Sequence, residues 1–175
     1  MTGSGVAAPG LFFRTMSQTR IPLTVAGVEK LKAELHRLKS VDRPAVIAAL
    51  AEARSHGDLS ENAEYDAAKE RQGFVEGRIS RLEANLAIAQ VVDPAAIDAD
   101  GRIVFGATVD LEDMESGNAV CYQIVGDDEA DIKHGKISSE SPIARALIGK
   151  SVGDVAEVQA PAGVREYEVL AVRYV

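Results

Sequence analysis

The chain has 175 residues, of which 46% are hydrophobic and 26% charged, and its formal net charge is −8. This composition is typical of one ordinary domain or two small ones and excludes a disordered chain. No stretch approaches the roughly 20 consecutive apolar residues that cross a bilayer, so we expect no membrane partner. We expect the single cysteine, Cys121, to be a small core residue in the reducing cytoplasm.

Residues 1–19 are expected to form a disordered N-terminal arm. The first fifteen of them are rich in small residues and carry one charge, Arg14. They lack the basic start and the long apolar run of a signal peptide.

Charge is distributed unevenly between the two halves of the chain. Residues 16–92 hold 11 basic and 11 acidic side chains, whereas residues 93–175 hold 7 basic and 16 acidic ones. An acidic second half argues against direct binding to duplex nucleic acid, which requires a basic face. It fits a protein partner with a basic surface better.

The first half of the chain begins with a helical pattern. Its apolar positions are spaced 3, 4 and 3 residues apart, at Val28, Leu31, Leu35 and Leu38. Thr24 is the expected N-cap. Pro44 interrupts the pattern, and the apolar stripe resumes one position out of step at Val46. We therefore expect a kink or a short break at residues 41–43.

A second and more regular helix follows. Its seam alternates between spacings of 3 and 4 over Tyr65, Ala68, Gln72, Val75, Ile79, Leu82, Leu86 and Ala89. Two such seams joined by a short connection predict an antiparallel coiled-coil hairpin over residues 20–92. With about 30 residues in each arm, the rod would be roughly 45 Å long.

The pattern changes after the hairpin, and residues 93–175 predict a second, α+β domain. Gly149 and Ser141 are the expected ends of one short helix, with Pro142 in its first turn. Short alternating strands are expected at residues 103–111, 119–125, 155–159 and 167–174. The domain is therefore predicted to be a small antiparallel sheet with one helix.

The connection between the two helices carries an acidic motif. Gly57 can end the first helix, and Asp58 stands three residues before Glu61. That spacing is typical of a capping box with Asp in place of Ser or Thr, and acidic residues at a helix start are also favoured by the helix dipole. Alternatively, the two carboxylates could hold Mg²⁺, weakly until a partner supplies the remaining ligands. Tyr65 continues the seam and is expected to be a packing residue that also faces the tip.

The sequence GDLSENAEY at residues 57–65 resembles the hairpin-tip motif of the bacterial GreA/GreB family of transcript-cleavage factors. The likeness covers residues 20–175. It includes Arg43-Pro44, Glu52-Ala53-Arg54, Gln72-Gly73-Phe74 and residues 124–131 and 141–150. Several separate motifs in the same order make this resemblance specific.

The resemblance implies a factor that enters the secondary channel of a backtracked RNA polymerase and stimulates the polymerase's own cleavage of the extruded RNA 3′ segment. By the same likeness, Asp58 and Glu61 would help to hold a second Mg²⁺ and orient the attacking water. The factor would not be an enzyme by itself. The free protein would bind no cofactor tightly, and we expect a monomer.

Other residues receive supporting roles from the same resemblance. Asn62 and Tyr65 would support the tip, and Arg54 and Lys69 would contact phosphates of the nascent RNA 3′ end. Alternatively, Arg54 and Lys69 could each be a charged side chain on the solvent-exposed face of the coiled coil, with no ligand. The acidic second half resembles the family's FKBP-like domain, which docks on the rim of the largest polymerase subunit. The residues matched to that contact are Asp127, Asp128, Ser141, Pro142 and Ile143; Ser141 and Pro142 could also simply begin a helix.

The sequence argues against three other interpretations. A prolyl isomerase would need a pocket lined with aromatic residues, and the second half offers only Phe105, Tyr122, Tyr167 and Tyr174. A relative that only occludes the channel does not need Asp58 and Glu61. A free-standing metal hydrolase would need further ligands, and no histidine is spaced to complete a site at the tip.

Overall fold

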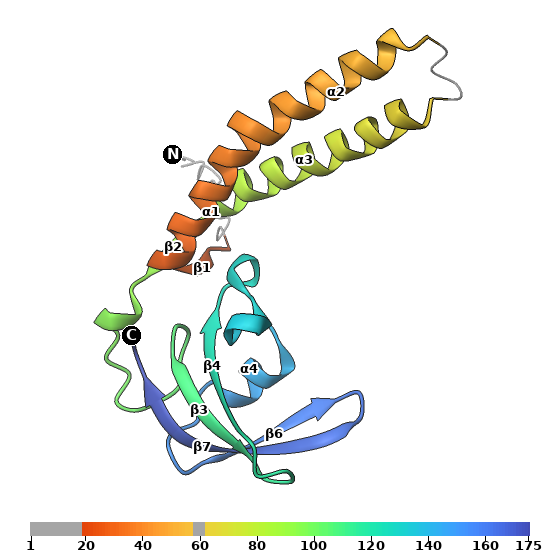
Figure 1. Cartoon of the computed structure of the whole chain (residues 1–175). Coiled ribbons are helices and arrows are strands. Elements are labelled where there is room, and N and C mark those ends of the chain that lie inside the picture. The colour runs from red at the N-terminus through yellow and green to blue at the C-terminus, as the bar shows by residue number, and fades with distance from the viewer. Residues whose placement is uncertain (1–18, 58–61) are drawn as a thin grey trace, which may run out of the picture.

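The structure is a computed structural model, and it describes residues 19–57 and 62–175. A long helical hairpin projects from a small curled sheet domain (Figure 1). The expected N-terminal arm lies, except for Thr19, outside the described residues. The α+β architecture predicted from the sequence is confirmed. No helix in the described part of the chain is long and apolar enough to cross a membrane.

The first arm of the hairpin consists of β1 (Ile21–Thr24), α1 (Val25–Arg37) and α2 (Arg43–Ser55). The hydroxyl of Thr24 accepts a hydrogen bond from the backbone N–H of Gly27 at 2.9 Å, which confirms the predicted N-cap.

The predicted interruption near Pro44 takes the form of a π-helical turn, η1 (Leu38–Asp42), and the arm does not break. The N–H of Arg43 donates to the carbonyl of Leu38, five residues earlier. A π turn contains one residue more than an α turn, and this extra residue explains why the apolar stripe resumes one position out of step. Pro44 has no N–H to donate, so it is tolerated where the α-helical ladder restarts.

The second arm is α3 (Ala63–Ala87), which runs antiparallel to α2. The helix ends two residues earlier than the seam predicted, because residues 89–92 form β2 (Ala89–Val92), which pairs in parallel with β1. The predicted seam is confirmed by two buried clusters between the arms. They comprise Val46, Leu50, Ala68, Val75 and Ile79 toward the tip and Leu23, Val28, Leu31 and Leu82 toward the base.

A short 3-10 turn, η3 (Pro94–Ala96), leads into a five-stranded sheet. The strands are β3 (Thr108–Asp113), β4 (Ala119–Val125), β5 (Lys136–Ser138), β6 (Val155–Ala160) and β7 (Gly163–Arg173). Their order is β5-β4-β3-β7-β6, and only β5 pairs in parallel, with β4. The first predicted strand of this domain therefore begins five residues later than expected, and β5 was not predicted.

The helix α4 (Pro142–Leu147) packs against the sheet, and the hydroxyl of Ser141 caps it by accepting from the N–H of Ala144 at 3.3 Å. Cys121 is exposed, so its predicted place in the core is wrong. Its partner in the register is Asp110, and both side chains lie on the outer face of the sheet. Desolvation, followed by the neighbouring Asp110, raises the pKa of the Cys121 thiol, so the thiol stays protonated at neutral pH.

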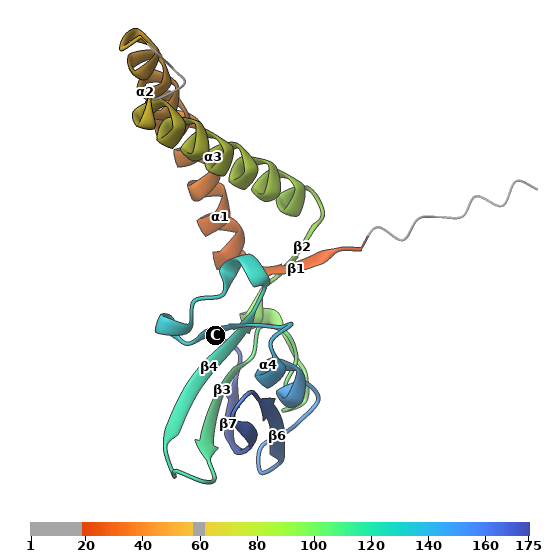
Figure 2. The ribbon, with the colours of Figure 1, turned by 90° about the vertical axis from the view of Figure 1, so that its right-hand side faces the viewer.

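The hairpin base is joined to the sheet domain through the 3-10 turn η4 (Asp127–Glu129), which lies at the foot of α1 (Figure 2). Glu129 is only 2% exposed. Its carboxylate accepts from the N–H of Thr24 at 3.1 Å, from that residue's hydroxyl, and from the N–H of Gly126 at 2.9 Å. A Cβ on Gly27 would lie 1.4 Å from Glu129 Oε1, so only glycine fits at that position. These contacts set the position of the rod on the sheet domain.

Candidate functional site at the hairpin tip

The two arms end together at the end of the rod that is remote from the sheet domain (Figure 1). His56 is the C-cap of α2, and Gly57 follows with φ of +101°, a left-handed conformation that favours glycine. Asp58 and Glu61 lie outside the described residues. They belong to the four-residue connection between Gly57 and Asn62, so the described residues on either side of them are at the tip.

Asn62 connects the two arms and caps α3. Its Oδ1 accepts from the backbone N–H groups of Glu64 and Tyr65, each at 3.1 Å, and its Nδ2 donates to the carbonyl of Ala53 at 2.8 Å. Of the two interpretations of Asp58, the one that makes it the cap of α3 is therefore wrong, because α3 begins at Ala63 and a cap residue directly precedes the first turn. Capping no longer explains why the connection is acidic.

Tyr65 and Arg54 form a second connection between the arms. Tyr65 is partly buried against the cluster toward the tip, which confirms its predicted packing role. The guanidinium carbon of Arg54 lies 5.8 Å from the centroid of the Tyr65 ring, within cation–π distance. Arg54 and Lys69 are both exposed, so both are accessible to a ligand. Their assignment to RNA stays a prediction.

A third connection joins His56 and Glu64, whose Nδ1 and Oε2 atoms lie 3.2 Å apart. Sequence reasoning missed this pair, because nothing in the spacing shows which residues face each other across a turn. With Glu64 engaged in this way, the magnesium prediction rests on Asp58 and Glu61. Within residues 19–57 and 62–175, no group of three histidine, cysteine or acidic side chains is arranged to hold a metal ion.

Asp128, which was assigned to a partner, is instead engaged inside the chain. Its side chain is 5% exposed, and its carboxylate lies 2.9 Å from Arg78 Nη1 and 3.0 Å from Arg81 Nη2. The amide of Asn85 also donates to it. In the sequence, the one indication of this contact was the spacing of Arg78, Arg81 and Asn85, which places them on one flank of α3. Asp128 is therefore better explained by attachment of α3 to the sheet domain.

Arg78 links this junction to the first arm as well. Its Nε lies 2.7 Å from Glu34 Oε1, and a second bond joins Nη2 to Oε2 at 2.9 Å. The hydrogen bond from Arg78 lowers the pKa of the Glu34 carboxyl, and the two carboxylates raise the pKa of Arg78. Arg78 thus binds both Glu34 and Asp128 and ties together three segments of the chain.

The remaining residues matched to docking lie on the sheet domain. Asp127 accepts a hydrogen bond from the Ser138 hydroxyl. Pro142 is exposed at the start of α4, while Ser141 and Ile143 beside it are partly buried. Ile143 packs against the core of the domain. The docking assignment of these residues stays a prediction.

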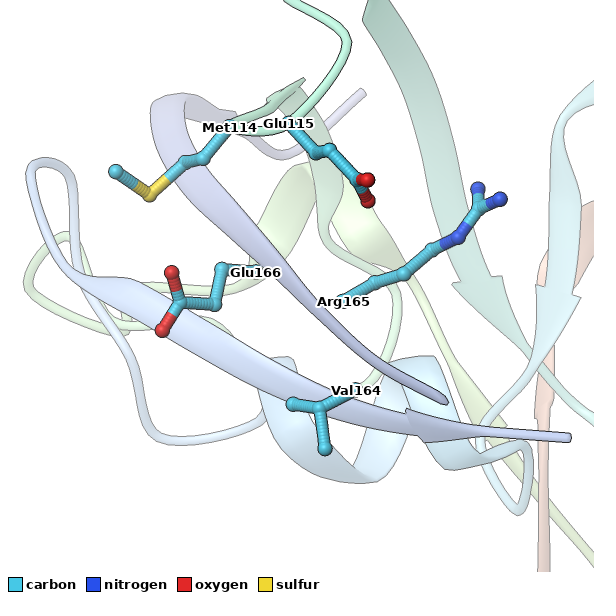
Figure 3. Close-up of a pocket in the computed structure, with 5 residues that line it drawn as sticks. All are labelled: Met114, Glu115, Val164, Arg165 and Glu166. Atoms are coloured by element: carbon cyan, nitrogen blue, oxygen red, sulfur yellow. The ribbon is translucent and has the colours of Figure 1, made fainter. Parts of the chain in front are cut away.

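The sheet domain also carries surface hollows, all far from the tip. One of about 410 Å³ lies where the chain after β3 meets the start of β7, and it is lined by Met114, Glu115, Val164, Arg165 and Glu166 (Figure 3). Another, of about 460 Å³, includes Tyr122 and Tyr167 among charged and polar residues. Neither resembles the aromatic-lined pocket that a prolyl isomerase would need.

Comparisons with known proteins agree with the two-part architecture. The family model described as "Transcription elongation factor, N-terminal" matches residues 21–91, and "Transcription elongation factor, GreA/GreB, C-term" matches residues 98–174. Transcription elongation factor GreA of Ralstonia nicotianae is 71% identical over 88% of this chain and 98% of its own length. GreA of Verminephrobacter eiseniae is 67% identical over 89% and 99%, respectively.

Among solved structures, GreA factor homolog 1 of Thermus thermophilus is 33% identical and matches 88% of this chain and 99% of its own. The TM-score is 0.41, so the assignment rests on the sequence matches. On those matches, the chain belongs to the GreA/GreB family of transcription elongation factors.

Proposed function

We propose that this elongation factor inserts its hairpin into the secondary channel of RNA polymerase and stimulates the polymerase's own cleavage of backtracked RNA, rescuing arrested complexes. One observation carries the proposal. The residues that flank Asp58 and Glu61 are fixed at the far end of the rod by bonds that belong to Asn62, so the fold uses a neutral amide where an acidic cap was expected. Because α3 already has a neutral cap, the acidic motif is better explained by a partner that uses its carboxylates.

Asp58 and Glu61 would hold a Mg²⁺ ion shared with the polymerase. Carboxylate oxygens are the ligands that this cation prefers, and two of them leave most of its octahedral shell to other groups. When bound, the cation supplies charge neutralisation at the phosphodiester and activates water. The two side chains would also orient that water. The free factor would hold the ion only weakly.

Arg54 and Lys69 would contact the phosphates of the RNA 3′ segment. The ring of Tyr65 lies under the Arg54 guanidinium and limits the positions that this side chain can adopt. A planar guanidinium held in this way can donate two parallel hydrogen bonds to one phosphate.

The sheet domain would dock outside the channel, on the rim of the largest polymerase subunit. Pro142 and Asp127, with Ser141 and Ile143, would form that contact, and one copy of the factor would act on one polymerase. The 25 residues of α3 span roughly 38 Å, which separates the docking surface from the tip.

The test is an RNA cleavage assay on stalled elongation complexes, with and without this protein. We expect the protein to accelerate shortening of the RNA from its 3′ end. We also expect no cleavage when the protein is incubated with the same RNA and Mg²⁺ in the absence of polymerase. Cleavage by the protein alone would contradict the proposal, and so would unchanged RNA in complexes that are shown to bind it.

A further inference from the structure

Phe74 is the most exposed large hydrophobic side chain in the described part of the chain, at 81%. It lies midway along α3, next to Val75, which is buried in the seam. A single exposed apolar residue is ordinary. Phe74 differs because the residues around it also lack a role within the chain.

Two glycines accompany Phe74 on α3. A Cβ placed on Gly73 or on Gly77 would meet nothing within 4 Å, and neither residue has a positive φ. Alanine would therefore fit at both positions, and it would favour the helix far more than glycine does. Neither the backbone nor the packing requires these glycines. Because these glycines have no side chain, another molecule can come close to the backbone of α3 at these two positions.

Phe74, Gly77 and three more residues make up what we call the Phe74 face: Ala67, Glu70, Arg71, Phe74 and Gly77. Helical spacing places Ala67, Arg71, Phe74 and Gly77 on one flank, and a hollow of about 330 Å³ lies between Phe74 and the preceding two turns. Within the described residues, neither Glu70 nor Arg71 forms an ion pair. The face thus presents an apolar centre with one acidic and one basic side chain at its rim.

The charges of Glu70 and Arg71 indicate which kind of molecule can bind to the Phe74 face. An RNA backbone would be attracted to Arg71 but repelled by Glu70 beside it. A protein helix can satisfy both if it carries an apolar side chain between a basic and an acidic one. Close approach over a glycine suits a second helix, because the backbones can then come nearer than side chains normally allow.

The location of the face fits a partner of the whole factor. Farther toward the base, the same flank of α3 carries Arg78 and Arg81, which bind Asp128 of the sheet domain. The Phe74 face therefore lies between the tip and the junction. An element that contacts it would set the depth and the rotation of the rod.

We propose that the Phe74 face packs against an α-helix of the polymerase, which crosses α3 over Gly77 with Phe74 as the anchoring side chain. The inference rests on the proposed function and adds to it a contact that neither the tip nor the docking surface provides.

The test compares the affinity for polymerase of four proteins: the parent, Phe74→Ala, Gly77→Ala and Ile47→Ala. Ile47 on α2, which is 54% exposed, is the matched control. It lies one helical turn after Arg43, and Arg43 pairs with Glu76 on the flank of the hairpin opposite to Phe74, so Ile47 is an exposed apolar residue outside the Phe74 face. We expect a loss of at least tenfold for Phe74→Ala, as for a buried aromatic anchor. We expect Gly77→Ala to bind several-fold more weakly although its melting temperature rises, and Ile47→Ala to stay within about twofold.

A photoreactive amino acid at position 74 then identifies the occupant. Attachment to a polymerase subunit supports the inference, whereas attachment to RNA overturns it. Affinities within twofold of the parent for both Phe74→Ala and Gly77→Ala overturn it too, and so does an equal loss in Ile47→Ala. A dimer of the free protein that Phe74→Ala dissociates would assign the face to a second copy. If the parent itself neither binds polymerase nor stimulates cleavage, the proposed function fails, and the inference with it.

Discussion

The hairpin tip and the domain junction both carry acidic motifs, yet the chain uses the two motifs differently. At the junction, the Glu129 carboxylate is buried and accepts hydrogen bonds from three donor groups, and Asp128 is bound by two arginines. At the tip, the helix is capped by the amide of Asn62. An acidic side chain whose bonding capacity is consumed inside the chain stabilises the fold. Where a neutral amide supplies the cap, the acidic motif beside it is better explained by a ligand than by the fold.

Sequence patterns alone did not separate these two uses of acidic residues. The spacing of Asp58 and Glu61 fitted both a helix cap and a Mg²⁺ site, and the family resemblance placed Asp127 and Asp128 at a docking contact. The structure gives the cap to Asn62 and bonds Asp128 to Arg78 and Arg81, because sequence spacing does not show which hydrogen-bond donors a carboxylate will meet. Burial and bond partners distinguish the two cases, and each can be tested by removing a charge while keeping the shape.

The largest effect is expected from paired isosteric substitutions, Asp58→Asn at the tip and Asp128→Asn at the junction. Loss of about 3 kcal/mol of charge stabilisation would lower the rate of stimulated RNA cleavage by about two orders of magnitude in Asp58→Asn. Its unfolding in urea should match the parent. Asp128→Asn should show the reverse pattern, a lower urea midpoint with cleavage retained at saturating protein. Two variants with the same pattern would contradict the distinction.

Removal of the buried carboxylate at the junction should produce the largest loss of stability. Glu129→Ala leaves the N–H groups of Thr24 and Gly126 without their acceptor, which we expect to lower the free energy of unfolding by about 2–4 kcal/mol. Urea denaturation measures this. Glu157→Ala, an exposed change on β6, is the control and should stay within about 0.5 kcal/mol of the parent.

The glycine beneath that carboxylate permits a sharper test. Gly27→Ala alone should destabilise the protein, because its Cβ would overlap Glu129 Oε1. In the Glu129→Ala background the overlap is gone, and the same change should be neutral or stabilising by up to about 1 kcal/mol, since alanine favours a helix. If the double variant instead lost as much stability as the two single variants together, the contact between position 27 and the Glu129 carboxylate would not be what requires glycine there.

A smaller loss is expected at the tip. Asn62→Ala removes the cap of α3, at a cost of about 1–2 kcal/mol. Asn62→Asp keeps the cap but loses the Nδ2 donor to the Ala53 carbonyl, so it should fall between the parent and Asn62→Ala. Urea unfolding gives the totals, and amide exchange at Glu64 and Tyr65 locates the change. Asp66→Ala, in the same turn, is the control.

The smallest effect concerns pH. The Arg78 guanidinium lowers the pKa of Glu34 in the folded chain. Glu34 therefore stabilises the fold above its unfolded pKa of about 4.3, and that contribution is lost as the pH falls through the lower folded pKa. We expect Glu34→Gln to be less stable than the parent by a few tenths of a kcal/mol at pH 7. In urea titrations from pH 7 to 3 the difference should close at the acidic end, and a constant difference would contradict the assignment.

Local patterns predicted much of the fold. The apolar spacing located both arms of the hairpin, and the one-position offset after Leu38 marked the π turn. Thr24 and Ser141 were recognisable as caps because a cap depends on neighbouring residues. Apolar spacing and helix capping each depend on residues that are close together in the sequence.

Features that depend on distant residues were not predictable from those patterns. The parallel pairing of β1 with β2, and of β5 with β4, joins segments whose contact no short motif specifies. The same holds for the bonds between Asp128 and α3. Cys121 was misplaced because its apolar neighbours in sequence alternate with it across the sheet, so they point to the other face.

The most direct test of the central claim is the Mg²⁺ dependence of stimulated cleavage. The parent, Asp58→Asn and Glu61→Gln are each added at saturating concentration to the same stalled complexes while Mg²⁺ is varied. If the tip carboxylates hold the cation, both variants should be defective at limiting Mg²⁺ and should recover in part as Mg²⁺ increases. Three superimposable curves would show that neither carboxylate takes part.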